Sequence, residues 1–293
     1  MKELTPETEA CLALGYFDSM HLGHRRIIEE MCGFAAELGL ASCVATFSNN
    51  AYKLFNREEK AVYTYAERCT LLEGTCDCVL PIKFDKRLKE TPAEKFLDEV
   101  FSAYSVKAVV CGYDHLFGAG AKGDAELLKA YCAAHGVPCR IIGKFELDGT
   151  RVSTTLVKEL LAAGKVEDAN RYLGTPFFAT GKVVHGRGAG RMFDIPTANL
   201  KLPADKLLPA TGVYGVECVV GDRTYKGAAN VGARPTFGLS KAETEVMIDD
   251  FSDNIYDESI TLRFIKYLRP VKRFDTPALL SKQVHEDIKW SDK

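Results

Sequence analysis

The first half of the chain alternates short apolar runs with longer segments in which apolar residues recur every three or four positions. Such runs predict buried strands, and the longer period predicts amphipathic helices packed against them. Strands are expected at Ala10–Leu14, Ser42–Phe47, Asp77–Ile82, Ala108–Gly112 and Cys139–Gly143. Helices are expected at Arg25–Glu37, Tyr65–Glu73, Asp124–His135, Ser153–Ala162 and Asp168–Leu173, and one more with Thr91 as its cap and Pro92 as its first residue. This alternation predicts an α/β domain with a parallel sheet, whose ligands bind at the carboxyl ends of the strands.

The pattern changes after Pro176, where short alternating runs are separated by glycine-rich turns. This texture predicts an antiparallel barrel or sandwich. Its strands are expected at Phe177–His185, Thr211–Val220, Arg223–Val231, Glu243–Asp250 and Ser259–Tyr267, with a closing helix at Thr276–Ile288. We therefore expect two domains, residues 1–174 and residues 175–293.

Composition narrows the class of protein. Of the 293 residues, 46% are hydrophobic and 27% charged, which is ordinary for a globular protein. The net charge of −2 gives no bulk attraction to nucleic acid or to an anionic membrane, so neither is expected as a partner. No apolar run is long enough to span a bilayer and the first ten residues are polar, so we expect a cytoplasmic protein. The ten cysteines are irregularly spaced and are expected to be reduced thiols, and the oligomeric state is not predicted.

Two histidines mark the first candidate site. The strand Ala10–Leu14 runs into Gly15, and a turn then brings His21 and His24 to the start of a helix. Free backbone amides and the helix dipole favour a phosphate there, and glycines such as Gly15 and Gly23 allow its close approach. An isolated H-x-x-H can equally be a solvated face or a metal pair.

A second candidate lies at the predicted helix start after residue 152. Ser153, Thr154 and Thr155 offer hydroxyls, and Lys158 follows one turn later, so together they can hold a phosphate. A serine or threonine at a helix start is more often only a cap.

The second half carries a glycine-rich loop followed by Pro-Thr-Ala-Asn in an expected turn. The loop amides can surround a phosphate, although the G-K-[ST] of a P-loop is missing. Thr197 and Asn199 offer hard oxygen ligands suited to Mg²⁺ beside ATP. The alternative for the loop is a flexible hairpin.

Two motifs of the first half resemble those of the nucleotidylyltransferase superfamily. They are the H-x-G-H of His21–His24, which follows a predicted strand, and the Ser-Thr-Thr-x-x-Lys of Ser153–Lys158. The segment from Gly112 to Gly118 resembles the G-x-D-F-x-F-G of one branch, the prokaryotic bifunctional riboflavin kinase/FAD synthetases, with His115 where phenylalanine is usual. The resemblance implies that ATP is bound by Gly15, Phe17, Asp18, His21, Gly23, His24, Ser153, Thr154, Thr155 and Lys158. It implies that the flavin lies against Gly112, Asp114, Phe117 and Gly118.

The second half resembles the riboflavin kinase module of the same family, so the resemblance covers roughly residues 10–288. It implies that Thr197 and Asn199 bind Mg-ATP and that Glu245 is the general base on the riboflavin 5′-hydroxyl. Glu243 is the alternative base by spacing, because a strand places both on one face. Further implied contacts are Gly186, Arg187, Gly188, Gly190 and Pro196 with ATP, and Arg269 and Phe274 with the flavin.

The expected function is therefore phosphorylation of riboflavin to FMN and adenylylation of FMN to FAD, with Mg²⁺ accompanying ATP. FMN and FAD are expected as substrate and product, not as prosthetic groups. The sequence departs from the family pattern in both halves. In the first half, Ser19 replaces a usual glycine, Ser48–Ala51 replaces a usual D-P-H-P, and Lys158 replaces a usual arginine. In the second half, Met247 replaces a common histidine and Asp257 a usual glycine. A kinase with an impaired first domain, and a flavin or nucleotide sensor without turnover, are the alternatives.

Overall fold

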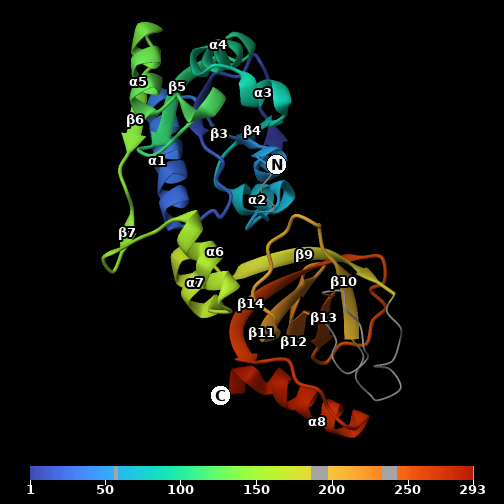
Figure 1. The fold of residues 1–293 in the computed structure, drawn as a ribbon. Helices are drawn as coiled ribbons and strands as arrows, with labels where there is room; N and C mark the ends of the chain where they lie inside the picture. Colours follow the sequence, from blue (N-terminus) through green and yellow to red (C-terminus); the bar gives the residue numbers. More distant parts are fainter. Residues whose placement is uncertain (56–58, 186–196, 233–242, 293) are drawn as a thin grey trace. The chain divides into compact units, whose positions relative to one another are not determined.

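The computed structural model describes residues 1–55, 59–185, 197–232 and 243–292 (Figure 1). The chain divides into two compact units, Met1–Thr154 and Thr155–Lys293. This division assigns the helices that precede the barrel to the second unit. The domain boundary predicted after residue 174 stays a prediction.

The first unit is built on a six-stranded parallel sheet in the order β1-β4-β3-β2-β5-β6, and the apolar runs predict all of these strands except β1. Its strands are β1 Lys2–Glu3, β2 Ala10–Leu14, β3 Ala41–Phe47, β4 Cys78–Ile82, β5 Val106–Gly112 and β6 Cys139–Ile142. A short antiparallel pair, β7 Glu146–Leu147 and β8 Thr150–Arg151, follows the sheet. The chain leaves β2 toward β3 on one side while β5 lies on the other, so the sheet has a topological switch point between β2 and β5.

Helices cover the sheet through their apolar faces. They are α1 Leu22–Leu38, α2 Tyr65–Leu72, α3 Lys86–Glu90, α4 Ala93–Ala103 and α5 Ala125–Ala134, with 3-10 turns at Ala51–Phe55 and Ala119–Ala121. Buried residues of α4 and α5 share one apolar cluster with the strands, and α1 contacts β2, β3 and β5. The predicted start of α4 is wrong by one residue, because Pro92 is its N-cap and Thr91 ends α3 by donating to the Arg87 carbonyl at 2.8 Å.

The second unit is a closed six-stranded antiparallel barrel in the order β10-β13-β12-β11-β14-β9 (Figure 1). Its strands are β9 Phe177–Val184, β10 Thr197–Lys201, β11 Gly212–Val220, β12 Arg223–Gly232, β13 Glu243–Ile248 and β14 Ser259–Arg269. Its helices are α6 Thr154–Ala162, α7 Val166–Leu173 and α8 Pro277–Ile288, followed by a 3-10 turn at Lys289–Asp292. Ile288 of α8 packs on Ala228 and Met247 of β12 and β13.

Strands β1, β7, β8 and β10 were not expected, and β10, the longest of them, carries candidate site residues. Thr197, Ala198 and Asn199, predicted to form a turn, begin strand β10, which pairs with both β9 and β13. The sequence pattern did not predict β10 because polar Thr197 and Asn199 lie on the outer face of the barrel and only Leu200 is buried. A strand with so few inward apolar residues lacks the alternation from which strands are predicted.

Candidate active sites

The His21/His24 turn lies where the prediction places it, directly after the central strand β2. His21 is the N-cap of α1, and its Nδ1 accepts a hydrogen bond from the His24 amide at 3.1 Å. The two imidazole rings stack with centroids 3.7 Å apart. The backbone takes positive φ at Phe17 (50°) and Met20 (48°), so the turn is tightly wound. Both histidines therefore meet the free amides of a helix start, which is an anion-binding position.

Burial sets the charge of these histidines. His21 is 7% exposed, and burial lowers its pKa to about 4. Burial also lowers the pKa of His24 well below its usual value, with further lowering from His21 and Arg68. The Nδ1 of His24 is buried and has no hydrogen-bond partner in the described part of the chain. At neutral pH the rings are therefore uncharged hydrogen-bonding groups.

The other residues of the first motif build the turn. A Cβ on Gly15 would lie 2.8 Å from the Phe17 ring, and a Cβ on Gly23 would lie 3.1 Å from the His21 ring. The Asp18 carboxylate is buried and accepts hydrogen bonds from the Val62 amide at 2.8 Å and from the Tyr52 hydroxyl at 3.2 Å. Asp18 thus links the turn to the segment around Tyr52 and Val62, and the ATP contact predicted for it stays a prediction.

The second motif meets the first through Ser19. Its hydroxyl lies 2.9 Å from Thr154 Oγ1 and is fully buried. This contact places Ser153 and Thr154 beside the His21/His24 turn. Thr155 and Lys158, on the first turns of α6, belong to the second unit of the chain. The serine that replaces the usual glycine therefore joins the two motifs.

The predicted flavin segment lies across the switch point, at the end of β5. A Cβ on Gly112 would lie 3.1 Å from Ile27 Cδ1 of α1. Asp114 pairs with Arg151 at 2.7 Å, and Phe117 and Gly123 exchange backbone hydrogen bonds of 3.0 Å. Gly118 has φ 70° and ψ 178°, a conformation that suits glycine alone, and a Cβ there would lie 2.5 Å from Ala93 Cα. The His115 ring stacks on Phe117, and burial lowers its pKa to about 4.

The altered segment at Ser48–Ala51 uses its asparagines to fasten the chain. Asn49 donates to the Phe84 carbonyl at 2.8 Å and accepts from the Phe84 amide at 2.8 Å. Asn50 donates to the Glu59 carbonyl and accepts from the Tyr52 amide. Both side-chain amides therefore hold the loops at the carboxyl ends of β3 and β4.

Sequence reasoning missed Arg68 of α2. It is 2% exposed, and its guanidinium donates to the carbonyls of Tyr16 at 2.7 Å and Phe47 at 2.6 Å. The available signal was an arginine four residues before Leu72, on the apolar face of a short helix.

The barrel brings three of the predicted kinase residues, Thr197, Asn199 and Glu245, together on its outer face. In the register of β10, β13 and β12, Glu245 lies between Asn199 and Asn230. The Thr197 hydroxyl donates a hydrogen bond to Glu245 Oε1. Asn230 Oδ1 is buried and has no hydrogen-bond partner among the residues that the structure describes. Glu243 begins β13 opposite Gly232, so Glu245 is the acid placed between the two asparagines.

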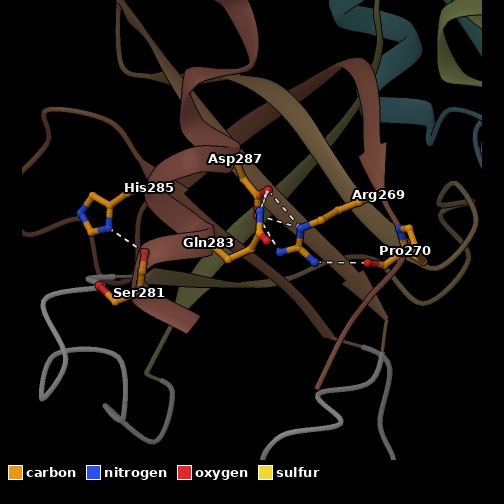
Figure 2. Close-up of polar contacts among 6 residues, drawn as sticks. All are labelled: Arg269, Pro270, Ser281, Gln283, His285 and Asp287. Atoms are coloured by element: carbon orange, nitrogen blue, oxygen red, sulfur yellow. Dashed lines mark hydrogen bonds and ion pairs between the residues drawn. The ribbon is translucent and has the colours of Figure 1, made fainter. Parts of the chain in front are cut away.

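Helix α8 is fixed beside this face by the Arg269 side chain (Figure 2). Its Nε and Nη2 donate to the carboxylate of Asp287 at 3.0 and 2.6 Å, and Nη1 donates to the Pro270 carbonyl at 3.2 Å. Gln283 adds a hydrogen bond to Asp287 at 3.0 Å. The Arg269 guanidinium lies 5.7 Å from the Phe274 ring centroid. The flavin contacts predicted for Arg269 and Phe274 stay predictions.

Two departures from the family have local structural reasons. Asp257 has φ 66°, a backbone conformation that favours the glycine usual there, and its carboxylate pairs with Lys182 at 2.9 Å. Met247 is buried against Ile288 of α8. The predicted ATP contacts Gly186, Arg187, Gly188, Gly190 and Pro196 lie outside the described residues.

Comparison with known families identifies the two units. Residues 4–156 match the model of FAD synthetase, and residues 173–293 match the model of riboflavin kinase. The chain therefore combines the modules of two flavin-converting, ATP-using enzymes.

Similar proteins carry both modules together. The chain is 34% identical to a bifunctional riboflavin kinase/FMN adenylyltransferase of Pseudomonas fluorescens, over 98% of this chain and 94% of that protein. It is 31% identical to the Escherichia coli K12 protein of the same name, over 96% and 91% of the two chains. A solved structure called a macrolide-efflux protein from Streptococcus pneumoniae aligns with a TM-score of 0.87 and 28% identity, covering 99% and 96%. The chain belongs to the bifunctional riboflavin kinase/FMN adenylyltransferase family.

Proposed function

We infer that the chain phosphorylates riboflavin with ATP to give FMN and ADP, and adenylylates FMN with ATP to give FAD and pyrophosphate. The observation that carries this inference is the match of both enzyme modules in one chain, with nearly full-length bifunctional relatives. ATP, riboflavin and FMN are then its small-molecule partners, with FMN and FAD as substrate and product. A cytoplasmic location stays a prediction, and no helix in the described ranges is long and apolar enough to cross a membrane.

For the kinase reaction, Glu245 is the proposed general base. Its carboxylate accepts the proton of the riboflavin 5′-hydroxyl while that oxygen bonds to the γ-phosphorus and ADP leaves. The hydrogen bond from Thr197 holds the Glu245 carboxylate in place on the outer face of the barrel.

Thr197 and Asn199 are the proposed Mg²⁺ ligands of the kinase site. They suit this ion because both offer neutral, hard oxygens, on one strand and one face beside an acid. Mg²⁺ bound there would neutralise phosphate charge during transfer.

For the adenylyltransferase reaction, no protein nucleophile is needed. An oxygen of the FMN phosphate bonds to the α-phosphorus of ATP, and pyrophosphate leaves with the electrons of the broken P–O bond. The neutral rings of His21 and His24 and the amides that begin α1 position the phosphates. Asp114, Phe117 and the glycines around them border the flavin across the switch point.

The first unit supports catalysis despite its departures from the family. Ser19 contacts Thr154, and Asn49 and Asn50 fasten the loops where the usual acid, histidine and prolines are missing. These contacts favour an intact adenylylation site over the kinase-only alternative. The Glu245 contact with Thr197 favours turnover over a sensor, because a binder has no need of a positioned base.

The experiment that tests this function supplies purified protein with riboflavin, ATP and Mg²⁺ and follows flavins by chromatography. FMN should accumulate first and FAD should follow. FMN without FAD would support the kinase-only alternative, and no conversion of either flavin would support the sensor.

A further inference from the structure

A buried arginine lies beside the phosphate-binding turn without belonging to any predicted motif. Arg68 of α2 donates through Nη1 to the Tyr16 carbonyl at 2.7 Å and to Thr46 Oγ1, and through Nη2 to the Phe47 carbonyl at 2.6 Å. Thr46 itself donates to the Tyr16 carbonyl at 2.6 Å. Tyr16 begins the His21/His24 turn after β2, and Phe47 ends β3. One side chain therefore ties together the two strand ends from which the site is built.

The three hydrogen-bond acceptors of Arg68 are neutral, and among the residues that the structure describes no carboxylate is hydrogen-bonded to it. Asp18 attracts it from farther away while accepting from Val62 and Tyr52. The Nε of Arg68 is buried and has no hydrogen-bond partner among the described residues. A buried cation without a hydrogen-bonded carboxylate is unfavourable, and an anion bound nearby would offset part of that cost.

Arg68 is the most buried cation near the turn, since Arg25, which donates to the Met20 carbonyl at 3.1 Å, is only half-buried. His21 and His24 are neutral at pH 7, since burial lowers both of their pKa values. Arg151 is exposed and already paired with Asp114. Arg68 lies close enough to His24 that its charge contributes to the low pKa of that histidine. The field of Arg68 therefore reaches the groups that would meet the phosphates.

We propose that Arg68 is a positioning residue for adenylyl transfer: it holds the ends of β2 and β3 together and supplies a buried positive charge that attracts the phosphates of ATP to the His21/His24 turn. The proposal rests on the proposed adenylyltransferase activity. Negative charge spreads over the phosphate oxygens as the FMN oxygen bonds to the α-phosphorus and pyrophosphate departs. A fixed cation in a site of low polarity stabilises that charge without having to reorient.

The test compares two variants. Arg68→Met keeps the length of the side chain but removes its charge, whereas Arg68→Lys keeps the charge but loses the guanidinium that donates to three acceptors. FAD formation from supplied FMN is expected to fall about 10- to 100-fold in Arg68→Met, less than the loss of a donor that touches the reacting oxygen. Arg68→Lys should recover most of the rate. Calorimetry with pyrophosphate alone should show that the wild type and Arg68→Lys bind it more tightly than Arg68→Met. The riboflavin kinase rate of each variant should equal that of the wild type.

A pH profile separates the charge from a merely structural role. The charged or titratable groups facing His24 are His21 and Arg68, and those facing Arg68 are Asp18, Tyr16, Tyr65 and Cys69. Removal of the Arg68 charge lets the His24 pKa rise, so the acid inflection of kcat/KM for FAD formation should move to higher pH in Arg68→Met. It should stay near the wild-type value in Arg68→Lys.

Equal rates, pyrophosphate affinities and inflections in Arg68→Met and Arg68→Lys would overturn the proposal, even if both variants were slow. A parallel fall in the kinase rate would also overturn it, because the damage would not be confined to the first unit. If Arg68→Met does not fold, Arg68→Gln provides a second uncharged variant. A wild-type chain that made no FAD would instead refute the adenylyltransferase function, and pyrophosphate affinity would still report on the charge.

Discussion

The two units build their candidate sites in different ways. In the first, the site gathers groups that are distant in sequence at the carboxyl edge of a parallel sheet: Ser19 meets Thr154, and Arg68 joins the ends of β2 and β3. In the second, the register of neighbouring antiparallel strands sets Glu245 between Asn199 and Asn230. The first site depends on burial, which fixes the charge of its histidines, and the second depends on strand register. Damage to one should therefore spare the other.

The largest expected effect tests that independence. Glu245→Gln removes the proposed base, so FMN formation should fall by about 10²- to 10⁴-fold. FAD formation from supplied FMN should not change, because Glu245 lies in the barrel. Chromatography of the flavins measures both rates. Glu217→Gln, at a half-exposed position within β11, is the matched control and should alter neither rate. Equal loss of both activities in Glu245→Gln would contradict separate sites.

The next effect concerns the contact that holds α8. Arg269→Ala leaves the buried Asp287 carboxylate without its ion pair, and breaking such a pair costs about 3–5 kcal/mol. Urea unfolding followed by the fluorescence of Trp290, the single tryptophan of the chain, should report this loss in the second unit. Lys182→Ala breaks an exposed ion pair and should change stability little. Equal effects of the two substitutions would show that the Arg269 contact is not buried in solution.

A third prediction contrasts the response of the two units to acid. His21 and His115 have folded pKa values of about 4, and that of His24 is also lowered, whereas an unfolded histidine titrates near about 6.5. Between these values the unfolded state binds more protons, so stability is lost as the pH falls from about 6.5 toward 4. Each group contributes up to about 1.4 kcal/mol per pH unit.

The second unit is the control, because its described histidines, His185 and His285, are exposed. Hydrogen exchange followed by mass spectrometry between pH 4.5 and 7 reads the two units separately. The slope of stability against pH should be steeper in the first unit, and His21→Gln should reduce it. Equal slopes would mean that the histidines are not buried in neutral form.

Periodicity predicted most of the fold because apolar residues face a core in both units. The strand Ala10–Leu14 is confirmed to the residue, and the helix at Tyr65–Leu72 nearly so. Strand β10 was missed because its outward residues, Thr197 and Asn199, are polar and only Leu200 is buried. The resulting pattern resembles that of a loop. Local sequence rules fail where residues are selected for a site instead of a core.

The site was predictable where its residues are close together in the chain, as in the His21/His24 turn. The contact of Ser19 with Thr154 joins residues 135 positions apart, and only the fold brings them together. Arg68 lies on the apolar face of a short helix, but the Tyr16 and Phe47 carbonyls to which it donates are brought to it only by the fold. Contacts of this kind require the three-dimensional arrangement.

The smallest expected effect tests the link between the two first-unit motifs. Ser19→Ala removes a buried hydrogen bond and should cost about 1 kcal/mol of stability, together with a several-fold rise in KM for ATP in FAD formation. Thr154→Val should have a similar effect, and the double variant should cost less than the sum of the two, because the residues share one contact. Thr154→Ser, which keeps the hydroxyl, is the matched control. Additive losses would show that Ser19 supports the turn without positioning Thr154.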